Sequence, residues 1–174
     1  SPINYPASNV IKAAMRLYQT ELKKPSVTVF CLDFSGSMRG EGQLELYDAM
    51  EYILNPDQAG EDYIQFSEKD EIYILPFDSR PGDEFSGNGS ESQKLLTEIY
   101  MLSASGGTDI YAPLIKALDL VEAYDNNAYT VSIVLMTDGE SLVTKLDELV
   151  ERYERCDQDV GIYSITFGDA NPRE

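Results

Sequence analysis

Three short polar segments, far apart in the chain, carry oxygen-bearing side chains at spacings that suit a metal ion. Hydroxyl and carboxylate oxygens are the ligands that the hard cations Mg²⁺, Mn²⁺ and Ca²⁺ prefer, whereas Zn²⁺ and Cu²⁺ favour sulfur and imidazole. The segments are Asp33-Phe-Ser35-Gly-Ser37, Gly106-Gly107-Thr108-Asp109 and Thr137-Asp138-Gly139-Glu140. We predict that they form one divalent-cation site whose metal ligands are Asp33, Ser35, Ser37, Thr108 and Asp138.

The charge of this ligand set indicates what the ion would bind next. Only Asp33 and Asp138 are charged, so the carboxylates just neutralise a divalent ion and the hydroxyls add no further negative charge. The ion therefore still attracts an anion, and the expected ligand is a carboxylate from a partner protein. The alternate spacing of the first three ligands directs their side chains at one point, and Gly36 relieves crowding there.

Taken singly, each segment has a simpler interpretation as turn or cap chemistry. The first reads as a turn with a helix N-cap, Thr108 as the cap of a following helix, and Asp138-Gly139 as a tight turn. Their joint occurrence favours the metal site, because chance does not readily place Asp-x-Ser-x-Ser after one apolar run and Thr-Asp-Gly after another.

Strands and helices alternate along the chain and must position these segments. Continuous apolar runs predict strands over residues 27–32, 71–75, 131–136 and 160–167. Helical spacing of apolar residues predicts helices over about 8–22, 44–54, 56–67, 90–100, 114–121 and 144–153. This alternation predicts an α/β fold with a doubly wound, mostly parallel central sheet and helices on both faces.

Local signals predict where several of these elements begin and end. Pro76 is expected to end the strand over 71–75 or to take an exposed edge position. Residues 80–89 read as a turn-rich hairpin or loop, Ser90-Glu-Ser-Gln93 resembles a capping box, and Thr144 is expected to cap the next helix. In the common strand order 3-2-1-4-5-6, strand 27–32 lies beside strand 131–136, so Asp33 and Asp138 face each other across the crevice where such sheets bind ligands.

Composition narrows the function further. The 174 residues suit one domain, and 31 acidic against 13 basic residues give a net charge of -18, which excludes nucleic acid as a partner. The absence of histidine excludes Ser-His-Asp and Cys-His catalysis and HExxH zinc sites. Cys31 and Cys156 read as buried thiols without metal-ligand spacing. No apolar run is long enough to insert in a membrane, and the first residues are not typical of a signal peptide.

From about Pro25 to Asp169 the chain resembles the von Willebrand factor type A (VWA) domain with its metal-ion-dependent adhesion site. The five proposed ligands match that motif at every position, in Asp-x-Ser-x-Ser, Gly-Gly-Thr-Asp-Ile-Tyr and Thr-Asp-Gly. The resemblance implies a Rossmann-like sheet with an antiparallel edge strand and one ion of the Mg²⁺ type, with Mn²⁺ or Ca²⁺ as alternatives. It also implies a non-enzymatic module that binds a protein or peptide through an acidic residue of that partner.

The resemblance also bears on organisation. Residues 1–24 read as a lead-in helical segment before a VWA-like domain over 25–174, similar to bacterial versions within larger surface or membrane-associated proteins. An extracytoplasmic or cell-surface location is therefore favoured over a cytoplasmic one. Family members usually continue past residues 167–174 into a last helix and often a sixth strand, so both elements are expected to be missing and apolar surface to be exposed.

Two other functions fit the same residues less well. A regulatory or structural module would dock through this site intramolecularly or onto an ATPase partner, as in some intracellular relatives. A Mg²⁺-dependent phosphoryl-transfer enzyme would use Asp33 as its nucleophile. Phosphatases of the haloacid dehalogenase type, however, place a second aspartate two residues on, and position 35 is Ser.

Overall fold

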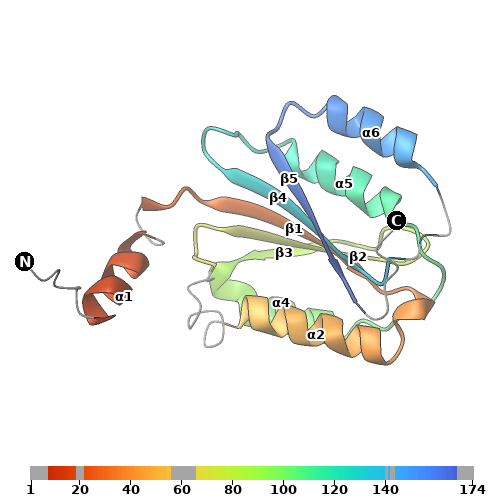
Figure 1. Cartoon of the computed structure of the whole chain (residues 1–174), viewed down its shortest axis with the longest axis horizontal. Helices are drawn as coiled ribbons and strands as arrows, with labels where there is room; N and C mark the ends of the chain where they lie inside the picture. The colour runs from red at the N-terminus through yellow and green to blue at the C-terminus, as the bar shows by residue number, and fades with distance from the viewer. Residues whose placement is uncertain (1–7, 19–21, 56–65, 140, 142–143, 168–174) are drawn as a thin grey trace, which may run out of the picture.

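Five strands form one central sheet in the order β3-β2-β1-β4-β5 (Figure 1). The computed structural model of the chain describes residues 8–18, 22–55, 66–139, 141 and 144–167. Only the β2–β3 pair is antiparallel, and the other three pairs are parallel. The predicted mostly parallel α/β sheet and its antiparallel edge strand are thus confirmed. The strands are β1 (Ser26–Asp33), β2 (Glu71–Phe77), β3 (Phe85–Asn88), β4 (Thr130–Thr137) and β5 (Val160–Thr166).

Strand β1 lies at the centre of the sheet and is buried along its whole length. Phe30 and Leu32 pack into the core on one face, whereas Val29 and Cys31 pack into the core on the other. Burial on both faces explains why its sequence is apolar without alternation. Because β1 pairs in parallel with both β2 and β4, all three strands end at the same edge of the sheet, where Asp33 is the last residue of β1.

Helices cover both faces of the sheet (Figure 1). Helices α2 (Glu41–Leu54) and α4 (Ser92–Tyr100) contribute Leu46, Met50 and Leu95 to the core on one face. On the other face, α5 (Tyr111–Val121) contributes Leu114 and Leu118, and α6 (Leu146–Glu154) packs beside α5. Two 3-10 turns, η2 (Gly36–Met38) and η3 (Gly89–Glu91), precede α2 and α4.

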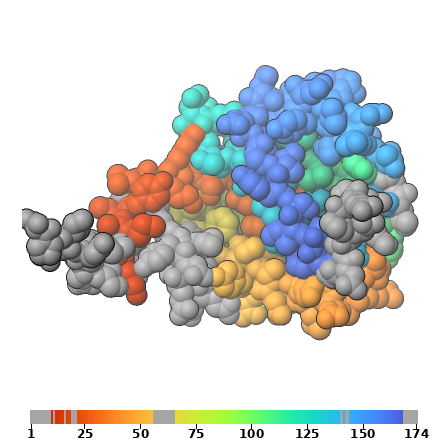
Figure 2. Space-filling view, in the orientation of Figure 1, coloured from red at the N-terminus to blue at the C-terminus, as the bar shows by residue number. Residues whose placement is uncertain are grey.

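Helix α1 (Ser8–Leu17) and strand β5 are among the elements that expose apolar side chains. Helix α1 stands away from the sheet in Figure 1, with Val10, Met15 and Leu17 exposed. At the other end of the described chain, β5 lies at the surface in Figure 2 and exposes Ile162, Tyr163 and Ile165. Among the described residues, no helix is both long and apolar enough to cross a membrane.

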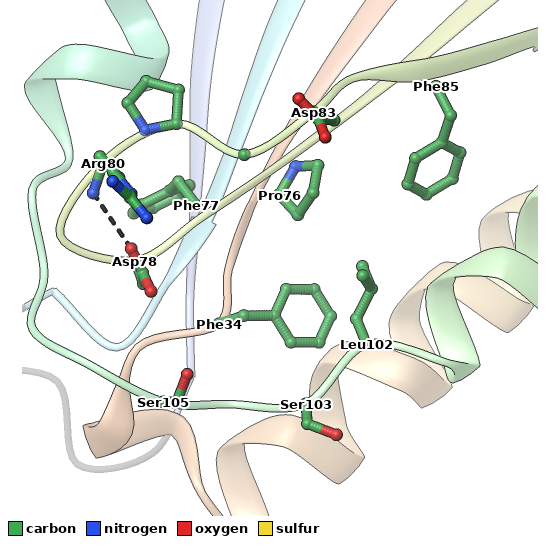
Figure 3. Close-up of a pocket in the computed structure, with 12 residues that line it drawn as sticks. Phe34, Pro76, Phe77, Asp78, Arg80, Asp83, Phe85, Leu102, Ser103 and Ser105 are labelled. Carbon is green, nitrogen blue, oxygen red and sulfur yellow. Dashed lines mark hydrogen bonds between the residues drawn. The ribbon is translucent and has the colours of Figure 1, made fainter.

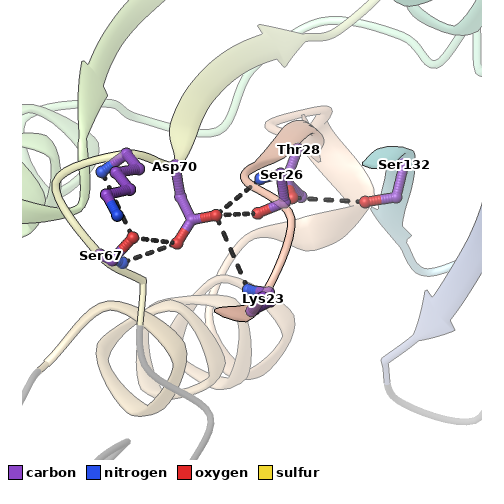
Figure 4. A network of polar contacts seen from close by, with 7 residues as sticks. Lys23, Ser26, Thr28, Ser67, Asp70 and Ser132 are labelled. Carbon is purple, nitrogen blue, oxygen red and sulfur yellow. Dashed lines mark hydrogen bonds and ion pairs between the residues drawn. The ribbon is translucent and has the colours of Figure 1, made fainter. Parts of the chain in front are cut away.

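The carboxylate of Asp70 ties the start of β1 to the segment before β2, at the edge of the sheet opposite Asp33 (Figure 4). Its Oδ1 accepts hydrogen bonds from the backbone N–H and the hydroxyl of Ser26, both at 2.7 Å. Its Oδ2 accepts from the backbone N–H and hydroxyl of Ser67, at 2.7 and 2.8 Å, and Lys23 Nζ lies 3.7 Å from Oδ1. One buried side chain therefore fixes two strand starts.

Several predicted boundaries are wrong in detail. Strand β2 continues through Pro76 to Phe77. The N–H that proline lacks would face β3, and β3 pairs with β2 only as far as Ile74, so no hydrogen bond is lost. Helix α1 is α-helical only to Leu17, but Tyr18 and Leu22 are π-helical and the Lys23 N–H donates to the Tyr18 carbonyl (2.6 Å), which agrees with the predicted helix end near residue 22. The predicted helix over 56–67 lies mostly outside the described residues, and Phe66 and Ser67 are not helical.

Two predicted caps also differ from the structure. The capping box before α4 pairs Asn88 with Glu91 rather than Ser90 with Gln93, because the turn η3 precedes the helix and moves the cap two residues towards the N-terminus. Thr144 does not cap α6, since Lys145 takes the N-cap position and makes no side-chain cap.

Candidate metal centre

Asp33 lies at the middle of the candidate site and is only 1% exposed. Its Oδ1 accepts a hydrogen bond from the backbone N–H of Ser35 (2.8 Å), and its Oδ2 accepts one from the hydroxyl of Thr137 (2.6 Å). Burial raises the pKa of Asp33; the hydrogen bonds from Thr137 and Ser35 oppose this rise, and the nearby charge of Asp138 adds to it. A bound cation would relieve both the burial of this charge and its repulsion by Asp138.

The two serines of the first segment bring their hydroxyls together. Ser35 Oγ and Ser37 Oγ are hydrogen bonded at 3.0 Å, Ser35 is buried, and Ser37 in η2 is exposed. Ser35 itself is extended, with φ -67° and ψ 167°, before the turn η2 begins. This change of backbone conformation sets the two hydroxyls side by side, as their spacing predicted.

Backbone hydrogen bonds hold the first segment against the second. The N–H of Gly36 donates to the carbonyl of Gly106 (3.0 Å), and the N–H of Ser105 donates to the carbonyl of Phe34 (2.7 Å). A Cβ at Gly36 would lie 2.9 Å from the Gly106 oxygen, so only glycine permits this approach. The predicted role of Gly36 in relieving crowding is therefore confirmed.

Thr108 is 5% exposed and precedes α5 in the second segment. Its hydroxyl has no hydrogen-bond partner among the residues that the structure describes. The predicted role of Thr108 as a helix cap is taken by its neighbour, since Asp109 Oδ1 accepts from the backbone N–H groups of Tyr111 (3.1 Å) and Ala112 (3.2 Å). Since this hydroxyl is not among the buried unpaired polar atoms of the described residues, it is accessible to water or to a ligand.

The third segment follows β4, next to β1. Thr137 ends β4, Asp138 is half-buried directly after it, and Gly139 has φ 89° and donates its N–H to the Thr137 hydroxyl (3.1 Å). Glu140 lies outside the described residues. Asp138 and Gly139 therefore form the tight turn, and the same turn sets Asp138 near Asp33.

The structure adds two residues that motif reasoning did not assign to the site. Thr137 fixes the orientation of the Asp33 carboxylate, and Lys145 binds Asp109 Oδ2 through its Nζ at 2.7 Å. This ion pair joins the second segment to the start of α6. Thr137 lies within the Thr-Asp-Gly motif, but nothing in the sequence around Lys145 indicates its partner. In the described ranges, no three carboxylate or thiol side chains cluster as metal ligands, so a cation here would depend on hydroxyl oxygens.

Asp109→Ala should lower the Tm by about 3–8 °C, because it removes a helix cap that accepts two backbone N–H groups at the start of α5. Lys145→Met should lower it less, since Asp109 then keeps both backbone donors and the favourable end of the helix dipole. Thermal unfolding by circular dichroism measures both, with Lys116→Met, which breaks an ion pair with the exposed Glu84, as the control. A larger loss in Lys145→Met than in Asp109→Ala would contradict the assignment.

A twisted parallel sheet with polar loops gathered beyond the ends of β1 and β4 defines a Rossmann-like α/β domain. Within that class the chain belongs to the von Willebrand factor type A domain family, whose model matches residues 28–140. Comparison with curated proteins gives no match.

Solved structures share this fold at low sequence identity. A von Willebrand factor type A protein from Catenulispora acidiphila superposes with a TM-score of 0.67 at 14% identity, over 83% of this chain and 34% of that one. The manganese-loaded TRAP protein of Plasmodium vivax gives 0.61 at 17%, over 87% and 65%. The pilus adhesin SpaC of Lactobacillus rhamnosus GG gives 0.55 at 20%, over 71% and 16%. The chain thus spans less than two thirds of each.

Proposed function

We propose that this chain is a divalent-cation-dependent binding module for a protein or peptide. In this proposal Asp33, Ser35, Ser37, Thr108 and Asp138 hold a Mg²⁺ ion, and the partner contributes an acidic side chain. The observation that carries the proposal is the Thr108 hydroxyl, which is accessible and makes no hydrogen bond to the described residues, although its segment is bonded to the one that holds the serines.

The residues present fit such an ion. They supply oxygen ligands only, as Mg²⁺ prefers, and three of the five are neutral hydroxyls that add no negative charge to the two carboxylates. When bound, the ion would act as an electrophile toward a carboxylate. Asp33 and Asp138 supply two negative charges, Thr137 and the Ser35 N–H orient Asp33, and Ser37 is exposed at the rim where a partner would approach.

Two proteins with this fold support the proposal. The TRAP structure holds manganese, and SpaC is a pilus adhesin, so a metal and an adhesive role both occur on this fold. Both proteins are longer than this chain. We infer that the chain acts as one module of a larger protein at the cell surface, which agrees with its net charge of -18 and with a protein or peptide partner rather than nucleic acid.

The residue two positions after Asp33 argues against phosphoryl transfer. Phosphatases of the haloacid dehalogenase type place a second aspartate there, and in this chain that residue is Ser35, whose hydroxyl is hydrogen bonded to Ser37. Binding therefore explains the same residues better than nucleophilic catalysis does.

Titration with Mn²⁺, followed by the loss of the free-ion electron paramagnetic resonance signal, tests the site. The wild-type chain should bind one ion, and Thr108→Ala should weaken that binding at least about tenfold because it removes a ligand. Thr97→Ala is the matched control, since Thr97 is exposed on α4 and its hydroxyl bonds only within that helix. Absence of binding at millimolar Mn²⁺, or an unchanged Kd in Thr108→Ala, would refute the proposed ligand set.

A further inference from the structure

A pocket of about 390 Å³ opens at the same edge of the sheet as the candidate metal centre (Figure 3). Its walls come from four separate parts of the chain. Phe34 follows β1, Pro76 lies near the end of β2, Phe85 begins β3, and Leu102 follows α4. A cavity of this size is at the lower end of the range for small-ligand sites, so it suits one large side chain better than a cofactor.

The pocket has an apolar end and a polar end. In Figure 3 the side chains of Phe34, Leu102 and Phe85 surround the apolar end. Asp78 and Ser105 line the other end. The Asp78 carboxylate accepts hydrogen bonds through Oδ1 from the Ser79 hydroxyl and the Arg80 N–H, both at 3.1 Å. A ligand in this pocket therefore meets apolar contacts at one end, and the charged side chains of Asp78 and Arg80 at the other.

The polar end adjoins the proposed metal ligands. Phe34 is the residue between Asp33 and Ser35, so one short segment serves both the pocket and the metal centre. Ser105 precedes Gly106, and a Cβ placed on Gly106 would lie 3.0 Å from Asp78 Oδ2. The pocket and the metal centre thus form one continuous surface over the ends of β1 and β2.

We propose that this pocket receives an apolar side chain of the same partner peptide that supplies the acidic group, which rests on the function proposed above. Adjacent residues of an extended peptide are about 3.5 Å apart, and Phe34 is one residue from two proposed ligands. The partner therefore carries Phe, Tyr, Leu or Met within about two to four positions of its Asp or Glu.

Charge restricts the residues between these two anchors. Two carboxylates, of Asp78 and Asp83, line the pocket against one cation, Arg80, and the chain as a whole carries a net charge of -18. A second acidic residue in the partner would be repelled by both. The preferred partner is a peptide with one isolated acid and a nearby large apolar residue, rather than a polyacidic tract.

Selection from a phage-displayed heptapeptide library with one fixed central Asp tests this proposal, with binding in Mg²⁺ and elution by EDTA. Peptides selected by the wild-type chain should be enriched in large apolar residues at a fixed offset from the Asp and depleted in further acids. Ser103→Trp places a ring at the exposed mouth of the pocket and should weaken the selected peptides about ten- to a hundredfold. Met101→Trp is the matched control, because Met101 is 78% exposed, is two residues away and does not line the pocket.

The outcomes separate this inference from the function on which it rests. Binding that needs Mg²⁺ and the Asp, but shows no apolar preference or is equally strong in Ser103→Trp, would overturn the pocket and leave the metal-dependent function intact. Absence of any Mg²⁺-dependent selection in the wild-type chain would overturn both. Mn²⁺ binding by each variant, measured as above, shows that the added rings leave the metal centre unchanged.

Discussion

Saturating Mg²⁺ should raise the Tm of the wild-type chain by about 5–10 °C and should not shift that of Asp33→Asn. A ligand at about 100 times its Kd that binds only the folded state adds roughly 2.7 kcal/mol, and each kcal/mol shifts the Tm of a domain this size by about 2–4 °C. Asp33 supplies one of only two charges in the proposed ligand set, so its neutralisation should remove most of the affinity for the ion. Differential scanning calorimetry with and without EDTA measures both shifts.

The pH dependence of these shifts provides a second check. Burial raises the pKa of Asp33, so its ionised form costs folding free energy above that pKa, and the cost disappears as the pH falls through it. In EDTA the wild-type Tm should therefore rise relative to that of Asp33→Asn as the pH is lowered. In Mg²⁺ the trend is opposite, and the wild-type Tm should fall relative to that of Asp33→Asn as the pH is lowered. Protons then compete with the ion for the carboxylate, so the Mg²⁺-induced rise in Tm shrinks. An equal Mg²⁺ shift in both proteins would exclude Asp33 as a ligand.

Asp70→Ala should be the most damaging substitution away from the metal centre, with a loss of about 3–5 kcal/mol and a fall in Tm of roughly 10 °C or more. The side chain is 2% exposed, and its removal leaves the donors of Ser26 and Ser67 without an acceptor at the starts of two strands (Figure 4). Urea unfolding gives the free energy directly. Glu84→Ala, which removes an exposed partner of Lys116, is the control and should cost less than about 1 kcal/mol.

Acid should remove the contribution of Asp70. Burial raises the pKa of Asp70, but the hydrogen bonds from Ser26 and Ser67 outweigh it, and the pKa lies below its ordinary value. Stability from such a carboxylate is fully present above its unfolded pKa of about 4 and is lost as the pH falls through the lower folded pKa. The difference between wild type and Asp70→Ala should thus be constant near neutral pH and narrow below about pH 4. A difference independent of pH down to pH 2 would exclude an ionised Asp70.

The sequence predicted the sheet well because its central strands are buried on both faces. Unbroken apolar runs placed the strands over 27–32 and 131–136 within one residue at each end, and the polar residues that follow them marked the edge where the proposed site lies. Pro76 was a poor guide to the end of β2. A proline interrupts a strand only where a neighbouring strand needs its N–H, and β3 pairs with β2 only as far as Ile74. The predicted cap before α4 was misplaced, because the short turn η3 leaves no hydrophobic periodicity in the sequence.

The candidate site was predicted in part. Spacing identified the five proposed ligands, and the structure brings the first segment against the second by backbone hydrogen bonds and places Asp138 near Asp33. The ion pair between Lys145 and Asp109 joins residues 36 positions apart, and neither has a motif that names the other. The pocket likewise depends on where β2 and α4 end and where β3 begins, so no local pattern reveals it.

The two backbone hydrogen bonds between the first and second polar segments have a consequence for how this domain could be altered. Gly36 and Ser105 donate to main-chain carbonyls, so the spacing of the loops does not depend on which side chains line the pocket. Ser103, which is exposed, could therefore be varied while the geometry of the proposed cation site stays constant, whereas Leu102 and Phe85 also pack against the core and tolerate only apolar replacements. If the proposed function holds, new peptide specificities could be selected at the mouth of the pocket without changing the proposed metal ligands.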